Sequence, residues 1–357
     1  MNTRLIWIRG ADMNSIDIAK IAGVSRSTVS RVINNYSNVP EETRERIQQI
    51  IKENNYVPHA SARMLAGVKN RIIGLFIIDM KVDSNGKQVT ASSYFSPFTG
   101  AVIDNASKLG YNVLVSIVSK QKDYKKVKEI FYNKTIAGGI FIGEKNGEPE
   151  IKEIINSGFK VALLDQAVKS DEEVYKKCII VNADSYGGAF KATNYLIDLG
   201  HSKIAHIVGV SEHLSSMERL DGYKKALTEA GITIKNSLIV KSDFTINGGY
   251  NATKKLLQKE IPTAIFCGND NMAIGALQAI QEDGLKVPED ISIVGFDDIE
   301  VARYINPALT TVRMALMEMA SVATNSLITS IENDSNFSAN YTVPIDLIER
   351  NSCKTLK

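Results

Sequence analysis

Short apolar runs alternate with longer amphipathic stretches along most of this chain. From residue 71 onward the runs occupy residues 72–78, 112–118, 139–142, 161–164, 179–181, 204–208, 264–267 and 291–296, and a last strand is expected at 343–347. Apolar runs separated by helix-like segments are typical of repeated βαβ units with a buried parallel sheet. Because about 290 residues exceed the usual size of a single core, the pattern predicts two similar α/β lobes rather than one.

The first part of the chain, residues 14–55, has a helical period instead. Two apolar faces follow one another closely: Ile18, Ile21 and Ala22, then Val29, Val32 and Ile33. Between them, Gly23 suits the left-handed corner of a tight turn and Ser25 suits the N-cap of the second helix. A third helix is expected after Pro40, and its apolar face consists of Ile47, Ile50 and Ile51. The spacing predicts a helix-turn-helix arrangement.

The outward face of the predicted second helix carries hydrogen-bonding and cationic groups: Ser27, Ser30, Arg31 and Asn34, with Arg26 in the first turn. A helix in a DNA major groove needs such groups, since Arg can chelate a guanine edge and Ser or Thr can hold a phosphate. A small helical bundle with a solvated face would explain the charge alone. The turn glycine, the cap and the polar face occur together, and this combination favours a DNA-recognition helix.

The composition limits the other functions. The chain carries a net charge of +2, so DNA affinity needs a local patch. The cysteines, Cys178, Cys267 and Cys353, are odd in number and scattered, which argues against a disulfide framework or a zinc cluster and suits a reducing cytoplasm. No apolar run approaches the roughly 20 residues that span a bilayer. We therefore expect a soluble, cytoplasmic protein that contacts no membrane and needs no metal or cofactor.

Two segments beside the helix-turn-helix are harder to interpret. Residues 1–12 are expected to be a disordered leader, or to reflect a start codon chosen too early. The stretch from Pro58 to Gly67 is shorter than the roughly 12–15 residues at which isolated helices become stable in water, so it would fold only against a partner. Leu65 could then act as a minor-groove wedge. A plain interdomain linker explains these residues equally well.

Several motifs together closely resemble the lactose-repressor/galactose-repressor (LacI/GalR) family of bacterial transcription regulators. At the amino end they are IAKIAGVSRSTVSRVIN at 18–34 and SARML at 61–65. Further along they are GHSKIAH at 200–206, RLDGY at 219–223, NDNMAIG at 269–275, VPEDISIVGFDD at 287–298 and NPALTTV at 306–312. The similarity runs from about residue 14 to about residue 350, nearly the whole chain.

The resemblance implies a homodimer that binds a palindromic double-stranded operator. It implies a helix-turn-helix headpiece at 13–58, a hinge helix at 59–70, and a core at 71–357 like that of periplasmic sugar-binding proteins. Lobe 1 would hold about 71–181 and 308–340, and lobe 2 about 182–307 and 341–357. Bases would be touched by Arg26, Ser27 and Arg31, phosphates by Ser25, Thr28 and Asn34, and the minor groove by Ala62, Arg63 and Leu65. The chain lacks the terminal apolar heptads of tetrameric relatives, so a dimer is expected.

The resemblance also points to an effector site between the lobes, formed by Tyr94, Phe95, Asp165, Ser215, Arg219, Phe244, Asn269 and Asp297. Carboxylates, an amide and a guanidinium can grip sugar hydroxyls, while an aromatic ring stacks on an apolar sugar face. Each Asp at a strand end could instead cap a helix, but ligands of open α/β sheets bind beyond the carboxyl ends of the strands. Residues 81–91 lengthen a loop that is short in the family. The default reading is a solvated loop, and a lid or partner contact is the alternative.

Three functions are compatible with parts of this pattern. The first is a ligand-responsive, sequence-specific regulator, a repressor of sugar-utilisation genes, whose operator affinity changes when a sugar or sugar derivative binds. The alternative is a sugar-binding protein without DNA function. An enzyme of the dinucleotide-binding class is disfavoured, because no GxGxxG, Walker, HExxH or GxSxG pattern occurs and the four histidines lack a nucleophile partner.

Overall fold

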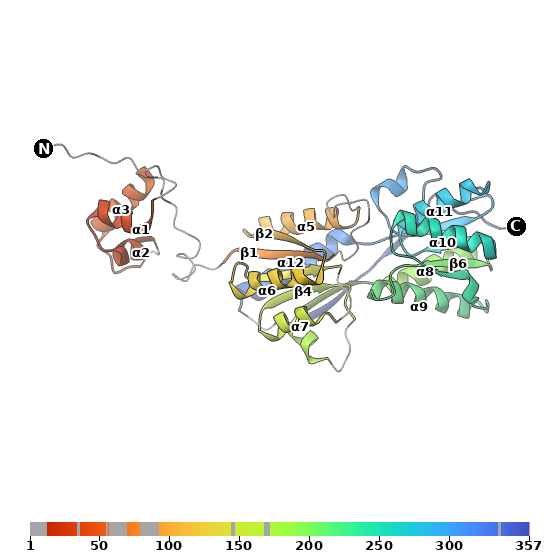
Figure 1. Ribbon diagram of the computed structural model, residues 1–357, viewed down its shortest axis with the longest axis horizontal. Coiled ribbons are helices and arrows are strands. Elements are labelled where there is room, and N and C mark those ends of the chain that lie inside the picture. Colours follow the sequence, from red (N-terminus) through yellow and green to blue (C-terminus); the bar gives the residue numbers. More distant parts are fainter. Residues whose placement is uncertain are drawn as a thin grey trace. The chain divides into compact units, whose positions relative to one another are not determined.

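The computed structural model describes residues 13–33, 36–54, 56, 70–78, 93–143, 147–167, 172–334 and 337–356. The chain divides into two compact units, Met1–Asn70 and Arg71–Lys357 (Figure 1). The expected leader at 1–12, the hinge segment at 59–69 and the loop at 81–91 lie outside the described residues.

The described part of the first unit forms three helices: α1 (Ser15–Ala22), α2 (Arg26–Ile33) and α3 (Glu41–Glu53). A capping box begins α1. The Asn14 side chain accepts from the backbone N–H of Asp17, and the Asp17 carboxylate accepts from the backbone N–H of Asn14. Fully buried Ile18, Val29 and Ile47 join the three helices in one apolar cluster. The Ser25 hydroxyl accepts from the Thr28 backbone N–H at 3.1 Å, which confirms the expected N-cap of α2.

One core residue of the first unit was predicted wrongly. Ile21 is 53% exposed, and Ala19 takes its place in the apolar cluster beside Ile18 and Ala22. Residues 18, 19 and 22 share the side of α1 that faces the other two helices, whereas residue 21 lies next to that side at 100° per residue. The expected face of α3 is fully buried only at Ile47.

The turn between α1 and α2 depends on Gly23, whose φ of 63° is left-handed. A Cβ added at this position would meet no atom within 4 Å, so the cost of Gly23→Ala comes from the backbone alone. We expect a loss of about 1–2 kcal/mol in the local stability of the helix-turn-helix. Amide hydrogen exchange of residues 15–33 in the full chain measures it. Gly100→Ala is the control, because its Cβ also meets open space and its φ is ordinary; equal effects of the two substitutions would contradict the argument.

The second unit contains two six-stranded sheets. In spatial order, the first is β11 (Ala339–Val343), β5 (Ile179–Ala183), β4 (Lys160–Leu164), β3 (Gly138–Ile142), β1 (Ile72–Ile78) and β2 (Asn112–Val118). The second is β12 (Asp346–Ile348), β10 (Thr310–Arg313), β9 (Ser292–Asp297), β8 (Ala264–Cys267), β6 (Ile204–Val208) and β7 (Ile239–Lys241). All neighbours are parallel except β12, which is antiparallel to β10.

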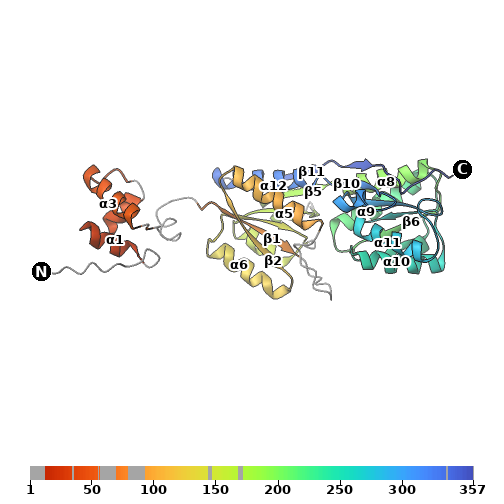
Figure 2. The same cartoon turned by 90° about the horizontal axis from the view of Figure 1, so that it is seen from above.

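Helices cover both faces of each sheet (Figure 2). The first sheet lies between the pair α5 (Phe95–Lys108) and α12 (Leu316–Glu332) and the pair α6 (Tyr124–Tyr132) and α7 (Pro149–Asn156). The second lies between α8 (Ser185–Asp198) with α9 (Leu214–Glu229) and α10 (Ile246–Lys259) with α11 (Asp270–Glu282). Side chains alternate between faces, so that Leu75 of β1 packs with α5 and α12 while Phe76 packs with α6 and α7. The predicted α/β class with two lobes is confirmed.

Four short 3₁₀ segments lie between these elements in the described chain: Gln121–Asp123, Glu173–Lys177, Asn236–Leu238 and Glu300–Arg303. In the same described residues no helix combines the length and the apolar character that crossing a membrane requires.

The chain passes between the two lobes at three described places: from β5 to α8, from β10 to α12, and from β11 to β12. Two sequence predictions are therefore wrong. Residues 310–313 form β10 in the second lobe rather than the first, and residues 341–343 complete β11 in the first lobe rather than the second. The single strand expected at 343–347 is divided between β11 and β12. Pro344 lies at this break, and proline has no N–H to continue a ladder.

Candidate DNA-recognition surface and effector site

The exposed side of α2 presents the groups expected to recognise DNA. The Ser25 hydroxyl hydrogen-bonds to the hydroxyls of Ser27 at 2.7 Å and Thr28 at 2.8 Å. The Arg26 Nε donates to the Ser15 hydroxyl of α1 at 3.1 Å, so a residue of the first helix holds this guanidinium. Arg31 is exposed in the last turn of the helix. The other expected DNA contacts lie outside the described residues: Asn34, Ala62, Arg63 and Leu65.

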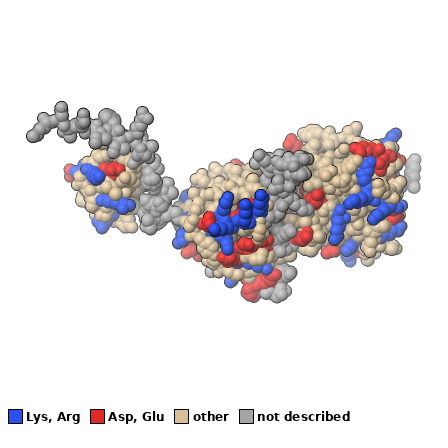
Figure 3. All heavy atoms as spheres, viewed as in Figure 1, with Lys and Arg blue, Asp and Glu red and all other residues tan. Residues whose placement is uncertain are grey.

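The charge of the first unit is mixed rather than uniformly positive. Lys and Arg side chains lie beside acidic ones on the face seen in Figure 3. A cationic and hydroxyl-rich helix face on such a surface can contact base edges and phosphates locally.

The predicted effector residues meet where strands of both lobes end. Asp165 follows β4 in a left-handed conformation, with φ of 59°. Its carboxylate accepts from the Ser215 backbone N–H at 2.9 Å and from the Ser215 hydroxyl at 2.8 Å. Ser215 lies in the first turn of α9, where the helix dipole favours a negative charge. Asp165 of the first lobe thus binds the start of a helix of the second lobe, so the capping alternative is correct in part.

Arg219 and Asp297 form a buried ion pair deeper in the site. Their side chains are 5% and 7% exposed, and the Nη2 and Oδ1 atoms lie 3.7 Å apart. The Arg219 Nη1 donates to the Gly268 carbonyl, Nη2 donates to the Met314 sulfur at 3.4 Å, and the guanidinium lies 3.7 Å from the centroid of the Phe296 ring. The Arg219 Nε and the Asp297 Oδ1 have no hydrogen-bond partner among the described residues. Buried polar atoms without partners are costly, and they accept or donate readily to a ligand.

Phe244 and Asn269 lie on the second lobe at the same edge. Phe244 has a left-handed φ of 68°, and its carbonyl accepts from the Asn269 Nδ2 at 3.1 Å. The Asn269 Oδ1 accepts from the Met272 backbone N–H at 2.9 Å and so caps α11. Asn269 therefore has a structural role that holds the Phe244 backbone in place. The Phe244 ring stands edge-on to that of His213 at 6.1 Å.

Tyr94 and Phe95 complete the set from the first lobe. Their rings are in edge-to-face contact, with centroids 5.2 Å apart. Burial raises the pKa of Tyr94, the charges of Asp165 and Asp297 raise it further, and Arg219 opposes them. The Tyr94 hydroxyl therefore lies in the field of the same charged groups. The structure links the eight predicted effector residues in four pairs: Asp165 with Ser215, Arg219 with Asp297, Phe244 with Asn269, and Tyr94 with Phe95.

Two carboxyl groups at the site have a raised pKa. Burial raises the pKa of Asp297 to about 7, Arg219 opposes the rise, and Asp165 adds to it. Burial likewise raises the pKa of Glu218, which is next to Arg219 in the chain, to about 7. In the part of the chain that the structure describes, no group of three or more His, Cys, Asp or Glu side chains could hold a metal ion.

The raised pKa of Asp297 predicts a stability that depends on pH. The folded pKa is above the unfolded value of about 4, so the folded state binds the extra proton more tightly. The stabilisation is fully present below about pH 4 and is lost as pH rises to about 7. Relative to Asp297→Asn, the unfolding free energy of the wild type should fall by up to about 1.4 kcal/mol per pH unit over this range. Urea denaturation at several pH values measures this difference; parallel profiles would contradict it.

Sequence reasoning missed some groups of the site. Phe296 and the Gly268 carbonyl belong to the ends of β9 and β8, and Met314 belongs to the crossing after β10. Nothing local in the sequence marks them, since each contacts Arg219 only through the tertiary fold. Ser15 in the first unit was missed for the same reason.

Two segments of the chain match families of known proteins. Residues 16–59 match the model described as bacterial regulatory proteins, lacI family, and residues 193–353 match a periplasmic binding protein-like domain. The chain is 32% identical over 347 residues to the HTH-type transcriptional repressor PurR of Vibrio atlanticus (strain LGP32), covering 95% of this chain and 98% of the relative. It is 34% identical over 349 residues to the HTH-type transcriptional regulator MalR of Clostridium butyricum, covering 96% and 99%.

Two solved structures share the fold over almost the whole chain. The lac repressor dimer bound to operator and the anti-inducer ONPF matches with a TM-score of 0.79 and 27% identity, covering 96% of this chain and 99% of that one. The complex of the transcriptional regulator CelR with cellobiose matches with a TM-score of 0.73 and 27% identity, covering 95% and 99%. The chain therefore belongs to the LacI family of bacterial regulatory proteins and is a ligand-responsive, DNA-binding transcriptional regulator.

Proposed function

We propose that this protein is a cytoplasmic repressor that binds a palindromic operator as a homodimer and responds to a sugar or sugar derivative. Ser27, Arg26 and Arg31 of α2 would contact bases, and Ser25 and Thr28 would contact phosphates. The proposal is supported by the exposed polar face of α2 and by the relatives, one named a repressor and one bound to operator as a dimer. We propose no enzymatic activity.

We place the effector between the lobes, on Arg219, Asp297 and Asp165. The observation that carries this assignment is the buried ion pair in which the Arg219 Nε and the Asp297 Oδ1 lack partners among the described residues. A sugar hydroxyl both donates and accepts, so one hydroxyl can satisfy the carboxylate and the guanidinium together. Tyr94, Phe95 and Phe244 would supply the apolar and aromatic walls. The complex of CelR with cellobiose supports a sugar as the ligand class.

A sugar-binding protein without DNA function is not favoured, because residues 16–59 match the DNA-binding regulators and α1 and α2 form a helix-turn-helix. The decisive experiment selects binding sites for the full chain from random duplex DNA, and footprints the selected site. We expect a protected dyad and an affinity that falls steeply with salt. A thermal-shift screen that includes cellobiose and ribose then tests the effector. Absence of any protected dyad, with or without sugar, would overturn the proposal.

A further inference from the structure

Two adjacent aspartates at the end of β9 contact different groups. Asp297 reaches Arg219 in the effector site, whereas the side chain of Asp298 is only 2% exposed and lies among three arginines. Both residues have positive φ, 113° for Asp297 and 54° for Asp298. Residues with side chains rarely adopt such conformations, so contacts around them must hold the backbone in place.

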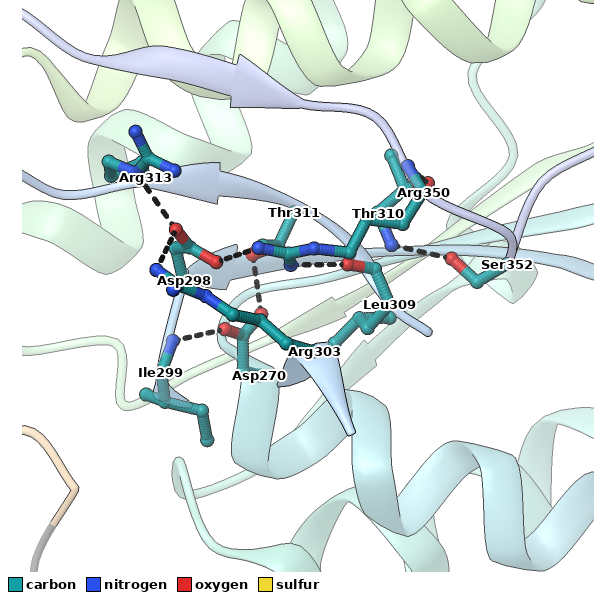
Figure 4. Close-up of polar contacts among 10 residues, drawn as sticks. All are labelled: Asp270, Asp298, Ile299, Arg303, Leu309, Thr310, Thr311, Arg313, Arg350 and Ser352. Atoms are coloured by element: carbon teal, nitrogen blue, oxygen red, sulfur yellow. Dashed lines mark hydrogen bonds and ion pairs between the residues drawn. The ribbon is translucent and has the colours of Figure 1, made fainter. Parts of the chain in front are cut away.

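Arginine contacts surround the Asp298 carboxylate (Figure 4). Oδ2 accepts from the Arg313 Nε at 2.8 Å and lies 3.6 Å from the Arg303 Nη2, while Oδ1 accepts from the Arg350 Nη2 at 2.5 Å. Burial alone would raise the pKa of Asp298, but the hydrogen bonds from Arg350 and Arg313 outweigh it and hold the pKa below its usual range. Asp298 is therefore a carboxylate at neutral pH, and both of its oxygens contact arginines.

The two hydrogen-bonded arginines come from two strands that the lobe crossings join: Arg313 ends β10, and Arg350 follows the end of β12 that is opposite its crossing. Arg313 is the last residue of β10, directly before the crossing to α12, and it pairs in register with Asp297 of β9. The next residue, Met314, accepts from Arg219. Arg350 follows β12, which the chain reaches through the crossing from β11, and its Nη1 also donates to the Leu309 carbonyl at 2.8 Å. The Asp298 carboxylate thus joins the start of the crossing after β10, and the segment that follows β12, to the strand end that carries Asp297.

We propose that Asp298 is a positioning residue for the effector response: held by Arg313 and Arg350, it fixes the place of the Asp297 carboxylate and transmits a change there to the lobe crossing after β10 and to β12. The inference rests on the proposed function, in which the effector binds Asp297. Asp298 touches no effector itself. It acts through one peptide bond on Asp297 and through two arginines on the end of β10 and on the segment after β12.

Asp298→Asn in the full chain tests the proposal, because it keeps the shape of the side chain and removes the charge. In the sugar-free protein, we expect amide exchange to rise at least about tenfold in residues 313–316 and 344–350 and to stay unchanged in α10 and α11. With cellobiose and ribose as probes, the concentration needed for half of the change in operator affinity should rise at least about tenfold. Operator affinity without sugar should change less than this.

Two further variants keep the test decisive if Asp298→Asn folds poorly. Arg313 is 48% exposed, so Arg313→Gln should fold and show the same changes more weakly. In the double variant, Arg313→Gln should add little to Asp298→Asn, because the two residues would act through one contact. Glu260→Gln is the matched control: it removes a carboxylate of the same lobe that pairs with Lys203 at 3.2 Å and Lys235 at 3.1 Å, away from the crossings.

The outcomes separate the two proposals. If neither sugar stabilises the wild type or changes its operator affinity, the proposed effector class is wrong for these sugars, while the exchange measurement still decides the role of Asp298. Unchanged exchange in residues 313–316 and 344–350 of Arg313→Gln and Asp298→Asn would overturn that role. An even rise of exchange throughout the second lobe would also overturn it, since such a rise would indicate a purely structural residue. Equal changes in Glu260→Gln would overturn it as well.

Discussion

Arg31→Ala is expected to lower the affinity for the selected operator by about 10–100-fold. Arg31 is exposed in the last turn of α2, on the face that also carries Ser27. A guanidinium that chelates a guanine edge contributes about 1–3 kcal/mol of discrimination, which corresponds to this range. The affinity for unrelated duplex DNA should fall much less, because that binding depends on phosphate contacts. Fluorescence anisotropy with operator and scrambled duplexes measures both affinities.

The control for this prediction is Arg46→Ala, which removes an exposed cation from α3 of the same unit. It should weaken binding to operator and scrambled DNA to a similar small extent. If Arg31→Ala behaved in the same way, Arg31 would be one charge among several and α2 would not be the base-reading helix. Thermal unfolding of both variants should remain close to that of the wild type, since both side chains are exposed.

Arg219→Met is expected to abolish the response to sugar and to destabilise the second unit by about 3–5 kcal/mol. The substitution leaves the Asp297 carboxyl buried without its cation, and breaking a buried pair in this way is costly. It also removes the contacts with the Gly268 carbonyl, with Met314 and with the Phe296 ring. Urea denaturation gives the loss of stability, and operator binding with and without sugar gives the response.

Lys254→Met is the matched control, because it also removes a cation paired with carboxylates of the second lobe, Asp283 and Glu282. That pair is more exposed and joins α10 to α11, so only a small effect on stability and none on the sugar response is expected. The destabilisation by Arg219→Met should be smaller at pH 5 than at pH 8, because protonation of Asp297 removes the unpaired charge. A sugar response that survived in Arg219→Met would exclude this pair from the effector site.

Features that depend on a few neighbouring residues were predicted correctly from the sequence. Gly23 and Ser25 were identified correctly, since a left-handed corner and an N-cap depend on a few adjacent residues. The eight apolar runs were also correct. Seven of these strands are buried almost throughout, and a strand buried on both faces is apolar along its length. The eighth, β2, lies at the sheet edge and is partly exposed despite its apolar sequence. β7 and β12, of three residues each, carry too few positions for any periodicity to be seen.

Errors arose where a residue's neighbours are distant in the chain. The sequence does not show that β10 pairs with β9 and that β11 pairs with β5, so the lobe crossings were misplaced. The same holds for Ile21, whose exposure depends on the angle at which α1 meets the other two helices. At the effector site the family motifs named the residues, but they did not reveal that Asn269 is engaged in capping α11 or that Asp165 binds the start of α9.

By itself, the sequence determined the kinds of element, the helix-turn-helix with its polar outer face, the α/β class and the family, because each of these is carried by spacing and residue type within short segments. Only the tertiary structure decided which carboxyl groups have a shifted pKa, and in which direction. Asp297 and Asp298 are neighbours of one type, yet burial beside Asp165 raises the pKa of the first while two arginines lower that of the second. Charges interact through space, and the fold places the partners of these two residues up to 132 positions away in the chain, from Asp165 to Asp297.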